Sequence, residues 1–271
     1  MDDGIRSAVT PCRPVTAEEI AHYQEFGWVK LASFVQPDVV RTLLDLARER
    51  MGEDGDSNAD YGLRQPYFNV EAGCGPASPL IKSLVEGVGR AAKALMHRRS
   101  TVGVRYFQDF FAPKLPAKRK TKHEGNGPTA FHQDFVTFGV DRSGGMTFWF
   151  PLEAYGPDAG TMSFINRSHR AGVLGNYRNY GNAEDVTGVF PELRELEVSE
   201  PMTYAAGDIT VHSHLTVHGA GANLMNKPRW AYIMLVQPAD ACWNGMPVEA
   251  CGNVPQPTNQ QLDDARFPVI A

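Results

Sequence analysis

The apolar residues of this sequence change their spacing once, close to residue 101. Before that point they recur every three or four residues, the spacing of helices that bury one face. After it they alternate with other residues, as in strands, over the segments 101–111, 130–138, 146–152, 161–165, 209–214 and 230–237. Strands that follow one another without helices between them favour an antiparallel sandwich or jelly roll over a parallel α/β sheet. We therefore expect a mainly β fold with its helices packed on the outside.

Three helices are expected in the first hundred residues. Thr16 and Glu19 fit a capping box, in which each side chain bonds the backbone amide of the other, so a helix should cover 17–26. Two further helices are expected over 37–51 and about 79–96, each beginning at a proline, which suits the first helical position. These helices would support the strand-rich part of the chain.

Charge and apolar content exclude several classes of partner. Lys plus Arg number 26 against 31 Asp plus Glu, and the resulting net charge of −5 argues against a nucleic-acid binder. The longest apolar runs, 146–152 and 230–236, are far shorter than a membrane span, and the acidic first residues lack the apolar stretch of a signal peptide. We expect a cytoplasmic protein whose partner is a small molecule, with neither nucleic acid nor membrane involved.

The four cysteines do not form a disulfide scaffold or a C-x-x-C zinc motif. Free thiols are expected in a chain of this length, although Cys242 and Cys251 could pair.

Four of the eight histidines fall in two strand segments and are candidate metal ligands: His132, His212, His214 and His218. Residues two apart on a strand share a face, so His132 and Asp134 could offer an imidazole and a carboxylate to one ion. With His218 from a distant strand they would make the two-histidine, one-carboxylate set of non-haem iron oxygenases. Alternatively, His212, His214 and His218 could face one way on a regular strand and form a three-histidine, cupin-type site.

Two cationic features accompany these histidines. Arg229 lies at the head of the strand 230–236, where an inward guanidinium could bind the distal carboxylate of a dicarboxylate co-substrate in a two-pronged pair. The basic run from Lys114 to Lys122 is interpreted as a solvated lid loop, and the alternative is a contact with an anionic partner such as the phosphates of a CoA ester.

Taken in order, these motifs resemble the phytanoyl-CoA dioxygenase (PhyH) family of Fe(II)- and 2-oxoglutarate-dependent oxygenases. The similar segments are 16–34, 131–134 (FHQD), 149–153 (WFPLE), 207–223 (GDITVHSHLTVHGAGAN) and Arg229. The resemblance covers most of the chain and implies a double-stranded β-helix, a cupin-like jelly roll, with supporting N-terminal α-helices.

The same resemblance implies one oxygenase domain over residues 1–271. Within it, about 1–100 would supply helical support and the first strands, about 101–240 the jelly-roll core, and 241–271 a C-terminal extension.

Roles for individual residues also follow from the resemblance. His132, Asp134 and His218 are the implied iron(II) ligands and Arg229 the implied anchor of 2-oxoglutarate, with O₂ as the second co-substrate. No catalytic side chain is implied beyond this metal centre. Because halogenating relatives lack the carboxylate ligand, the presence of Asp134 argues against halogenation.

The pocket for the co-substrate is implied to be lined by Trp149, Gln108 and Thr129. At Ala220 the chain departs from the family, which often has a serine there, so that one hydroxyl contact to the co-substrate is missing or replaced.

The implied activity is oxidation, most simply hydroxylation, of an unactivated C–H bond in a small, largely apolar molecule such as a secondary metabolite. Aromatic residues expected near the mouth of the jelly roll are the candidate substrate contacts: Tyr67, Phe110, Phe135 and Phe138. The alternatives are hydroxylation of an acyl-CoA and a non-catalytic jelly-roll module that only binds its ligand.

Overall fold

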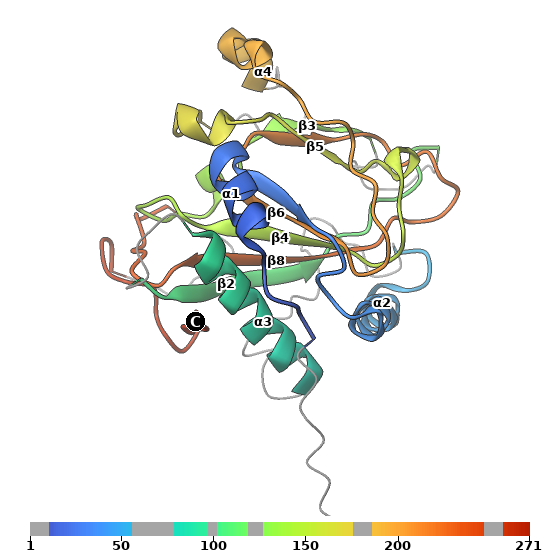
Figure 1. Ribbon diagram of the computed structural model, residues 1–271, viewed down its shortest axis with the longest axis horizontal. Coiled ribbons are helices and arrows are strands. Elements are labelled where there is room, and N and C mark those ends of the chain that lie inside the picture. The colour runs from blue at the N-terminus through green and yellow to red at the C-terminus, as the bar shows by residue number, and fades with distance from the viewer. Residues whose placement is uncertain (1–10, 56–78, 97–101, 119–126, 176–185, 247–256) are drawn as a thin grey trace, which may run out of the picture.

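Two antiparallel sheets form the body of the protein (Figure 1). The computed structural model describes residues 11–55, 79–96, 102–118, 127–175, 186–246 and 257–271. The larger sheet has the strand order β1-β6-β4-β8-β2 and the smaller one β3-β7-β5. Their bounds are β1 Trp28–Leu31, β2 Val104–Phe111, β3 Thr129–His132, β4 Met146–Pro151, β5 Met162–Phe164, β6 Ile209–Ser213, β7 His218–Ala220 and β8 Ala231–Pro238. Neighbours within each sheet come from distant parts of the sequence, as a jelly roll requires, and the mainly β prediction is confirmed.

The helices begin where their capping residues predict. Helix α1 (Ala17–Phe26) has a complete capping box, in which Thr16 Oγ1 accepts from Glu19 N at 3.2 Å and Glu19 Oε2 accepts from Thr16 N at 2.8 Å. Helices α2 (Pro37–Met51) and α3 (Pro79–Leu95) each start at the expected proline. The shorter helical pieces are α4 Val186–Val189 and the 3₁₀ turns η1 Phe135–Thr137, η2 Pro157–Ala159, η3 Ser168–Ala171 and η4 Pro191–Glu195.

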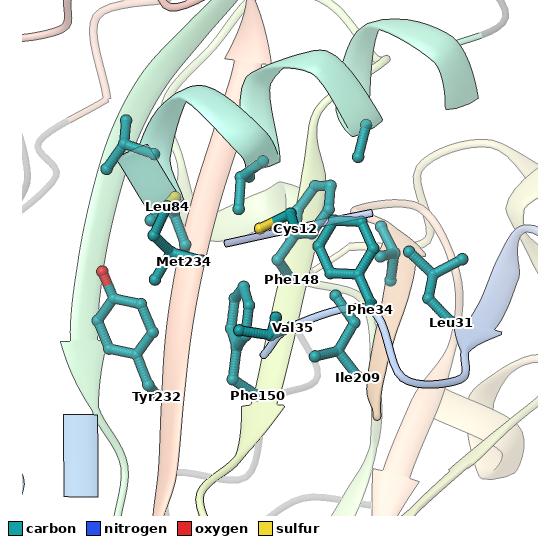
Figure 2. Packing of buried hydrophobic residues seen from close by; sticks show 14 of the residues in the cluster. Cys12, Leu31, Phe34, Val35, Leu84, Phe148, Phe150, Ile209, Tyr232 and Met234 are labelled. Carbon is teal, nitrogen blue, oxygen red and sulfur yellow. The ribbon is translucent and has the colours of Figure 1, made fainter. Parts of the chain in front are cut away.

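Helices α2 and α3 lie on the side of the larger sheet that faces away from the smaller sheet (Figure 1). Their apolar faces meet the outward side chains of the sheet in one buried cluster, which Figure 2 shows from close by. Leu84 of α3, Phe148 and Phe150 of β4 and Met234 of β8 belong to it and are almost wholly buried. Burial of this apolar surface is the main stabilising contribution of the N-terminal helices.

The other face of the larger sheet points toward the smaller sheet. Because successive side chains of a strand alternate, Thr147 and Trp149 of β4 lie opposite Phe148 and Phe150. Thr147 hydrogen-bonds to Asp134, which follows β3 of the smaller sheet. The space between the sheets is therefore where polar groups of the two layers meet.

The strand predicted over 130–138 is wrong in its second half. Strand β3 ends at His132, and Asp134 adopts a helical backbone conformation (φ −76°, ψ −32°) at the start of η1. The chain turns here because Thr137 closes a local turn, with its amide and its hydroxyl both donating to the carbonyl of Asp134. The orientation of the Asp134 side chain is therefore not set by the alternation of residues along a strand.

The last residues of the chain return to the larger sheet. Val104 N at the head of β2 donates to the carbonyl of Ala271 at 2.7 Å, and the ring of Phe267 stacks on Phe107 at 5.3 Å. Arg105, which is buried, donates to Asp264 and to the carbonyl of Phe267. The C-terminal extension thus packs along β2, while the division into one domain with three parts stays a prediction.

Two smaller predictions concern cysteines and membranes. Cys12 and Cys242 carry free thiols, and Cys251, the partner considered for Cys242, lies outside the described residues. Among the helices in the described ranges, none is both long and apolar enough to cross a membrane.

Candidate metal centre

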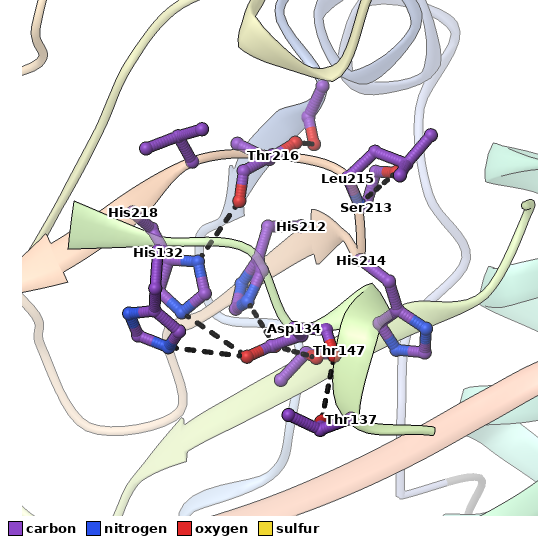
Figure 3. Close-up of polar contacts among 12 residues, drawn as sticks. His132, Asp134, Thr137, Thr147, His212, Ser213, His214, Leu215, Thr216 and His218 are labelled. Carbon is purple, nitrogen blue, oxygen red and sulfur yellow. Dashed lines mark hydrogen bonds and ion pairs between the residues drawn. The ribbon is translucent and has the colours of Figure 1, made fainter. Parts of the chain in front are cut away.

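Two imidazoles and one carboxylate converge between the sheets (Figure 3). One ligand atom from each of His132, Asp134 and His218 can be chosen so that all lie within 4.8 Å of one another. Asp134 Oδ1 is 3.5 Å from His132 Nε2 and 3.8 Å from His218 Nε2. The three side chains are only 4%, 10% and 8% exposed. The structure thus brings together the three residues expected from the sequence.

Strand pairing and backbone contacts aim the two imidazoles. His132 of β3 and His218 of β7 are directly paired across the smaller sheet. The Nδ1 atom of His132 lies 2.8 Å from the carbonyl oxygen of Ala130, and that of His218 lies 3.1 Å from the carbonyl oxygen of Thr216. A carbonyl oxygen only accepts, so each Nδ1 carries the proton and each Nε2 is left as the ligand atom.

The carboxylate of Asp134 is held from the larger sheet. Its Oδ2 accepts from Thr147 Oγ1 at 2.8 Å and from His212 Nε2 at 3.2 Å, which leaves Oδ1 toward the two ligand imidazoles. Burial disfavours the charged carboxylate, but the hydrogen bond from His212 Nε2 favours it, and the pKa of Asp134 lies well below its usual value. Asp134 is therefore ionised and fixed in orientation before any ion arrives.

The three-histidine interpretation of this region is wrong. Strand β6 ends at Ser213, and the turn that follows sends His218 into the other sheet. His214 points to another place, where its ring lies 4.4 Å from that of Phe138 and Nδ1 lies 3.4 Å from Gln237 Nε2. Even spacing would align these residues only on an unbroken strand, so His214 and His218 do not share a metal site.

The donor set fits an iron(II) ion. Two neutral imidazoles and one carboxylate are the protein ligands of the facial triad used by non-haem iron oxygenases, which leaves other positions for co-substrates. Burial, followed by the nearby His212, lowers the pKa of His218 well below its ordinary value, so this imidazole is neutral as a metal ligand must be.

Arg229 and Trp149 lie together on the inner side of the larger sheet. Arg229 is 6% exposed, its Nη1 donates to the carbonyl of Gly160 at 2.9 Å, and its guanidinium lies 5.0 Å above the ring of Trp149. Gly160 has φ +67°, and a Cβ there would approach the Gly221 oxygen to 2.4 Å. The backbone of Gly160 can therefore come close to Arg229 and Gly221 only because it lacks a side chain.

The other two residues expected at the co-substrate pocket, Thr129 and Gln108, lie on different strands. Thr129, on β3, is bonded through Oγ1 to Lys114 Nζ at 3.2 Å. Gln108 is half-buried on β2, opposite Leu235 of β8, and its contact with the co-substrate stays a prediction.

Three of the four candidate substrate contacts belong to one apolar cluster. Phe138 is buried in one apolar cluster, and Phe110 and Phe135 pack against it half-buried. Phe135 directly follows Asp134 in the chain, and contact of these three rings with a substrate stays a prediction. Tyr67 lies outside the described residues.

Lys114 corrects the interpretation of the basic run. It is not on a solvated loop: it is 6% exposed and pairs with Arg229 through two backbone hydrogen bonds of 2.9 Å. Lys118 is exposed as expected, and residues 119–122 lie outside the described part of the chain. Composition places a run of lysines on the surface, and only the long-range pairing with Arg229 reveals that the first of them is buried.

A jelly roll with this triad between its sheets defines the class of non-haem iron, 2-oxoglutarate-dependent oxygenases. The family model of phytanoyl-CoA dioxygenase (PhyH) matches residues 23–231. The chain belongs to this family of enzymes, and the interpretation as a binding module without catalysis is set aside.

Solved structures with the same fold include enzymes of several activities. The carbocyclase SnoK from nogalamycin biosynthesis is 22% identical, with a TM-score of 0.69 over 95% of this chain and 97% of its own. The epimerase SnoN, in complex with Fe³⁺, α-ketoglutarate and nogalamycin RO, is 21% identical, with a TM-score of 0.67 over 94% of this chain and 98% of its own. EctD from S. alaskensis, with 2-oxoglutarate and 5-hydroxyectoine, is 19% identical, with a TM-score of 0.66 over 99% of this chain and 92% of its own.

At these identities the solved structures show the fold and not the substrate. A comparison with curated proteins finds no significant match.

Proposed function

We propose that the protein oxidises, most simply by hydroxylation, an unactivated C–H bond of a small, largely apolar molecule, with iron(II), 2-oxoglutarate and O₂. The observation that carries this proposal is the buried convergence of His132, Asp134 and His218 on one point between the sheets. Family membership supplies the class of reaction, and the apolar residues beside the triad support the kind of substrate.

Each residue of the site has a distinct task in this proposal. His132, Asp134 and His218 hold the ion, and Arg229 anchors the distal carboxylate of 2-oxoglutarate against the face of Trp149. When bound, iron with 2-oxoglutarate and O₂ supplies the oxidising power that breaks the C–H bond. The side chains of the protein therefore position the reactants and exclude water, and no separate acid or base is needed.

The substrate class is supported by the side chains next to the ligands. Phe110, Phe135 and Phe138 offer aromatic surface on the side of Asp134, which suits a molecule with an apolar body. A secondary metabolite fits this surface, and the carbocyclase SnoK and the epimerase SnoN, which have the same fold, are enzymes from nogalamycin biosynthesis. An acyl-CoA substrate loses part of its support because Lys114 is buried and cannot join an exposed phosphate-binding patch.

The remaining expectations extend this proposal. We place the reaction in the cytoplasm and assign the whole chain, residues 1–271, to one oxygenase domain, with the three parts about 1–100, 101–240 and 241–271. The free thiols of Cys12 and Cys242 support a reducing compartment.

Succinate formation tests the proposed function. Purified protein is incubated with iron(II), labelled 2-oxoglutarate and a panel of apolar metabolites, and succinate is measured with and without iron. Iron-dependent succinate that is lost in His132→Ala and in Arg229→Gln supports the proposal. Equal succinate from His132→Ala and from the wild type contradicts it.

A further inference from the structure

The two ligand histidines are oriented by backbone carbonyls that are supported in different ways. His132 Nδ1 meets the carbonyl of Ala130, which lies inside strand β3, whereas His218 Nδ1 meets the carbonyl of Thr216. Thr216 belongs to no strand, because β6 ends at Ser213 and β7 begins at His218. The orientation of His218 therefore depends on how the turn between these two strands is held.

A carbonyl at the end of helix α1 holds this turn. Gly27 caps the helix with a left-handed backbone (φ +84°), and its carbonyl oxygen accepts from Ser213 N at 2.8 Å and from Thr216 Oγ1 at 2.6 Å. A Cβ at Gly27 would lie 2.6 Å from Thr216 Oγ1, so only glycine allows this approach. Thr216 N donates to the carbonyl of Ser213 at 2.8 Å and closes the turn. Both ends of the turn are thus bonded to one oxygen atom.

The peptide unit between Thr216 and Val217 is also held from its other side. Val217 N donates to Ser168 Oγ at 2.8 Å, and Ser168 Oγ donates to the carbonyl of Ile165 at 2.7 Å. Because a peptide unit is planar, a fixed N–H also fixes the direction of the carbonyl in the same unit. This carbonyl is the one that meets His218 Nδ1 at 3.1 Å (Figure 3). Thr216, Val217 and Ser168 are fully buried, so water does not compete for these bonds.

The hydroxyl of Thr216 is not needed to satisfy the oxygen of Gly27. If the hydroxyl is removed, this oxygen keeps the hydrogen bond from Ser213 N and is not left without a partner. An apolar side chain of the same shape would therefore fill this position with little loss of stability. What the hydroxyl adds is a fixed direction for the turn that precedes His218.

We infer that Thr216 is a positioning residue: its hydroxyl, bonded to the carbonyl of Gly27, fixes the turn that aims His218 Nε2 toward the other two ligands. This inference rests on the metal centre of the proposed function and deepens it, because it links that centre to the end of α1. The hydrogen bond joins residues that are 189 positions apart in the sequence.

Metal binding without turnover tests the inference. Iron(II) affinity of Thr216→Val is measured anaerobically by competition with a chelator, and the visible absorption of bound cobalt(II) reports the arrangement of the ligands. Loss of the hydroxyl should weaken iron(II) binding about tenfold, the lower end for a group that orients a metal ligand, and should change the cobalt(II) spectrum. Thr216→Ser keeps the hydroxyl and should restore both wild-type values. Thr210→Val, the same substitution at an equally buried threonine bonded to Tyr204, is the matched control and should change neither.

A third variant keeps the test independent of how valine packs. Thr216→Ala removes the hydroxyl without placing a methyl group in its position and should show the same loss of affinity. Wild-type affinity and an unchanged cobalt(II) spectrum in Thr216→Val or Thr216→Ala, or an equal loss in Thr216→Ser, overturn the inference. These results leave the proposed metal centre intact if iron is still lost in Asp134→Ala, whereas a wild type that binds no iron(II) contradicts both.

Discussion

The two faces of the five-stranded sheet are built from the same strands, but one face is apolar and the other carries polar and cationic groups. On the outer face, Phe148 and Phe150 of β4 pack against α2 and α3 in an apolar cluster. On the inner face, Thr147 of the same strand bonds Asp134, and Trp149 lies under Arg229. The role of a side chain thus changes with each step along the strand, because the alternation of β structure turns successive residues to opposite faces.

This difference separates stability from chemistry. The outer face stabilises the fold by burying apolar surface. This free energy is proportional to the buried area and does not depend on the orientation of the side chains. The inner face consists of directed hydrogen bonds whose value depends on the positions of individual atoms. Substitutions on the outer face should therefore lower the free energy of unfolding and leave the metal site in place. Substitutions on the inner face should weaken metal binding and leave the fold in place.

The largest expected effect is at the inner face, in Asp134→Ala. Without its only carboxylate the triad loses the anionic ligand and the group that His212 and Thr147 hold, so iron binding and succinate formation should both be abolished. Iron content after gel filtration measures this. Asp141→Ala, an aspartate bound to Arg142 outside the triad, is the control and should retain iron.

On the outer face, Phe148→Ala should cost about 3–5 kcal/mol of unfolding free energy, because it leaves a cavity under α3. Urea unfolding measures the loss, and the folded fraction should still bind iron with wild-type affinity. Val269→Ala, at an exposed residue, should change stability by less than about 0.5 kcal/mol. Loss of iron affinity in folded Phe148→Ala would show that the two faces are not separable.

A smaller effect is expected from Thr147→Val, which keeps the shape of the side chain and removes only its hydroxyl. Asp134 Oδ2 then loses one of its two partners, and iron affinity should fall about 10–100-fold, as when a group that orients a metal ligand is removed. Competition with a chelator gives the affinity. Thr210→Val removes a hydroxyl bonded to Tyr204 on the same face and should leave iron affinity unchanged.

The smallest effect is a pH dependence of stability that arises at His214. Burial lowers the pKa of His214 from 6.5 to about 3, so between these values the unfolded chain binds more protons than the folded one. Stability should therefore fall as the pH falls below 6.5, by about 2 kcal/mol for this group between pH 7 and pH 5. Urea unfolding of metal-free wild type and His214→Asn at both pH values measures it, and an identical pH dependence in the two proteins would contradict this assignment.

Local signals in the sequence were sufficient for the helices and most strands. The capping box at Thr16 and the proline at Pro37 fix helix starts within a few residues, and alternation marks the long strands β2, β4 and β8. The triad was also predictable, because its residues occur in a familiar order.

The contacts that hold the triad were not predictable in this way. Asp134 lies beyond the end of its strand, and its partners Thr147 and His212 come from another sheet. The charged sequence neighbours of Lys114 predict a solvated loop, whereas its surroundings are set by Arg229 and Gly221, more than a hundred residues away. Periodicity reports which face a residue uses and says nothing about which distant residue it meets.

Iron content of three proteins tests the central claim most directly. Wild type, Asp134→Ala and His214→Ala are loaded with iron(II) under anaerobic conditions, freed of excess metal and analysed for bound iron. If His132, Asp134 and His218 hold the ion, the wild type and His214→Ala retain stoichiometric iron and Asp134→Ala retains none. Iron that persists in Asp134→Ala but is lost in His214→Ala would contradict the assignment and return the site to the three histidines.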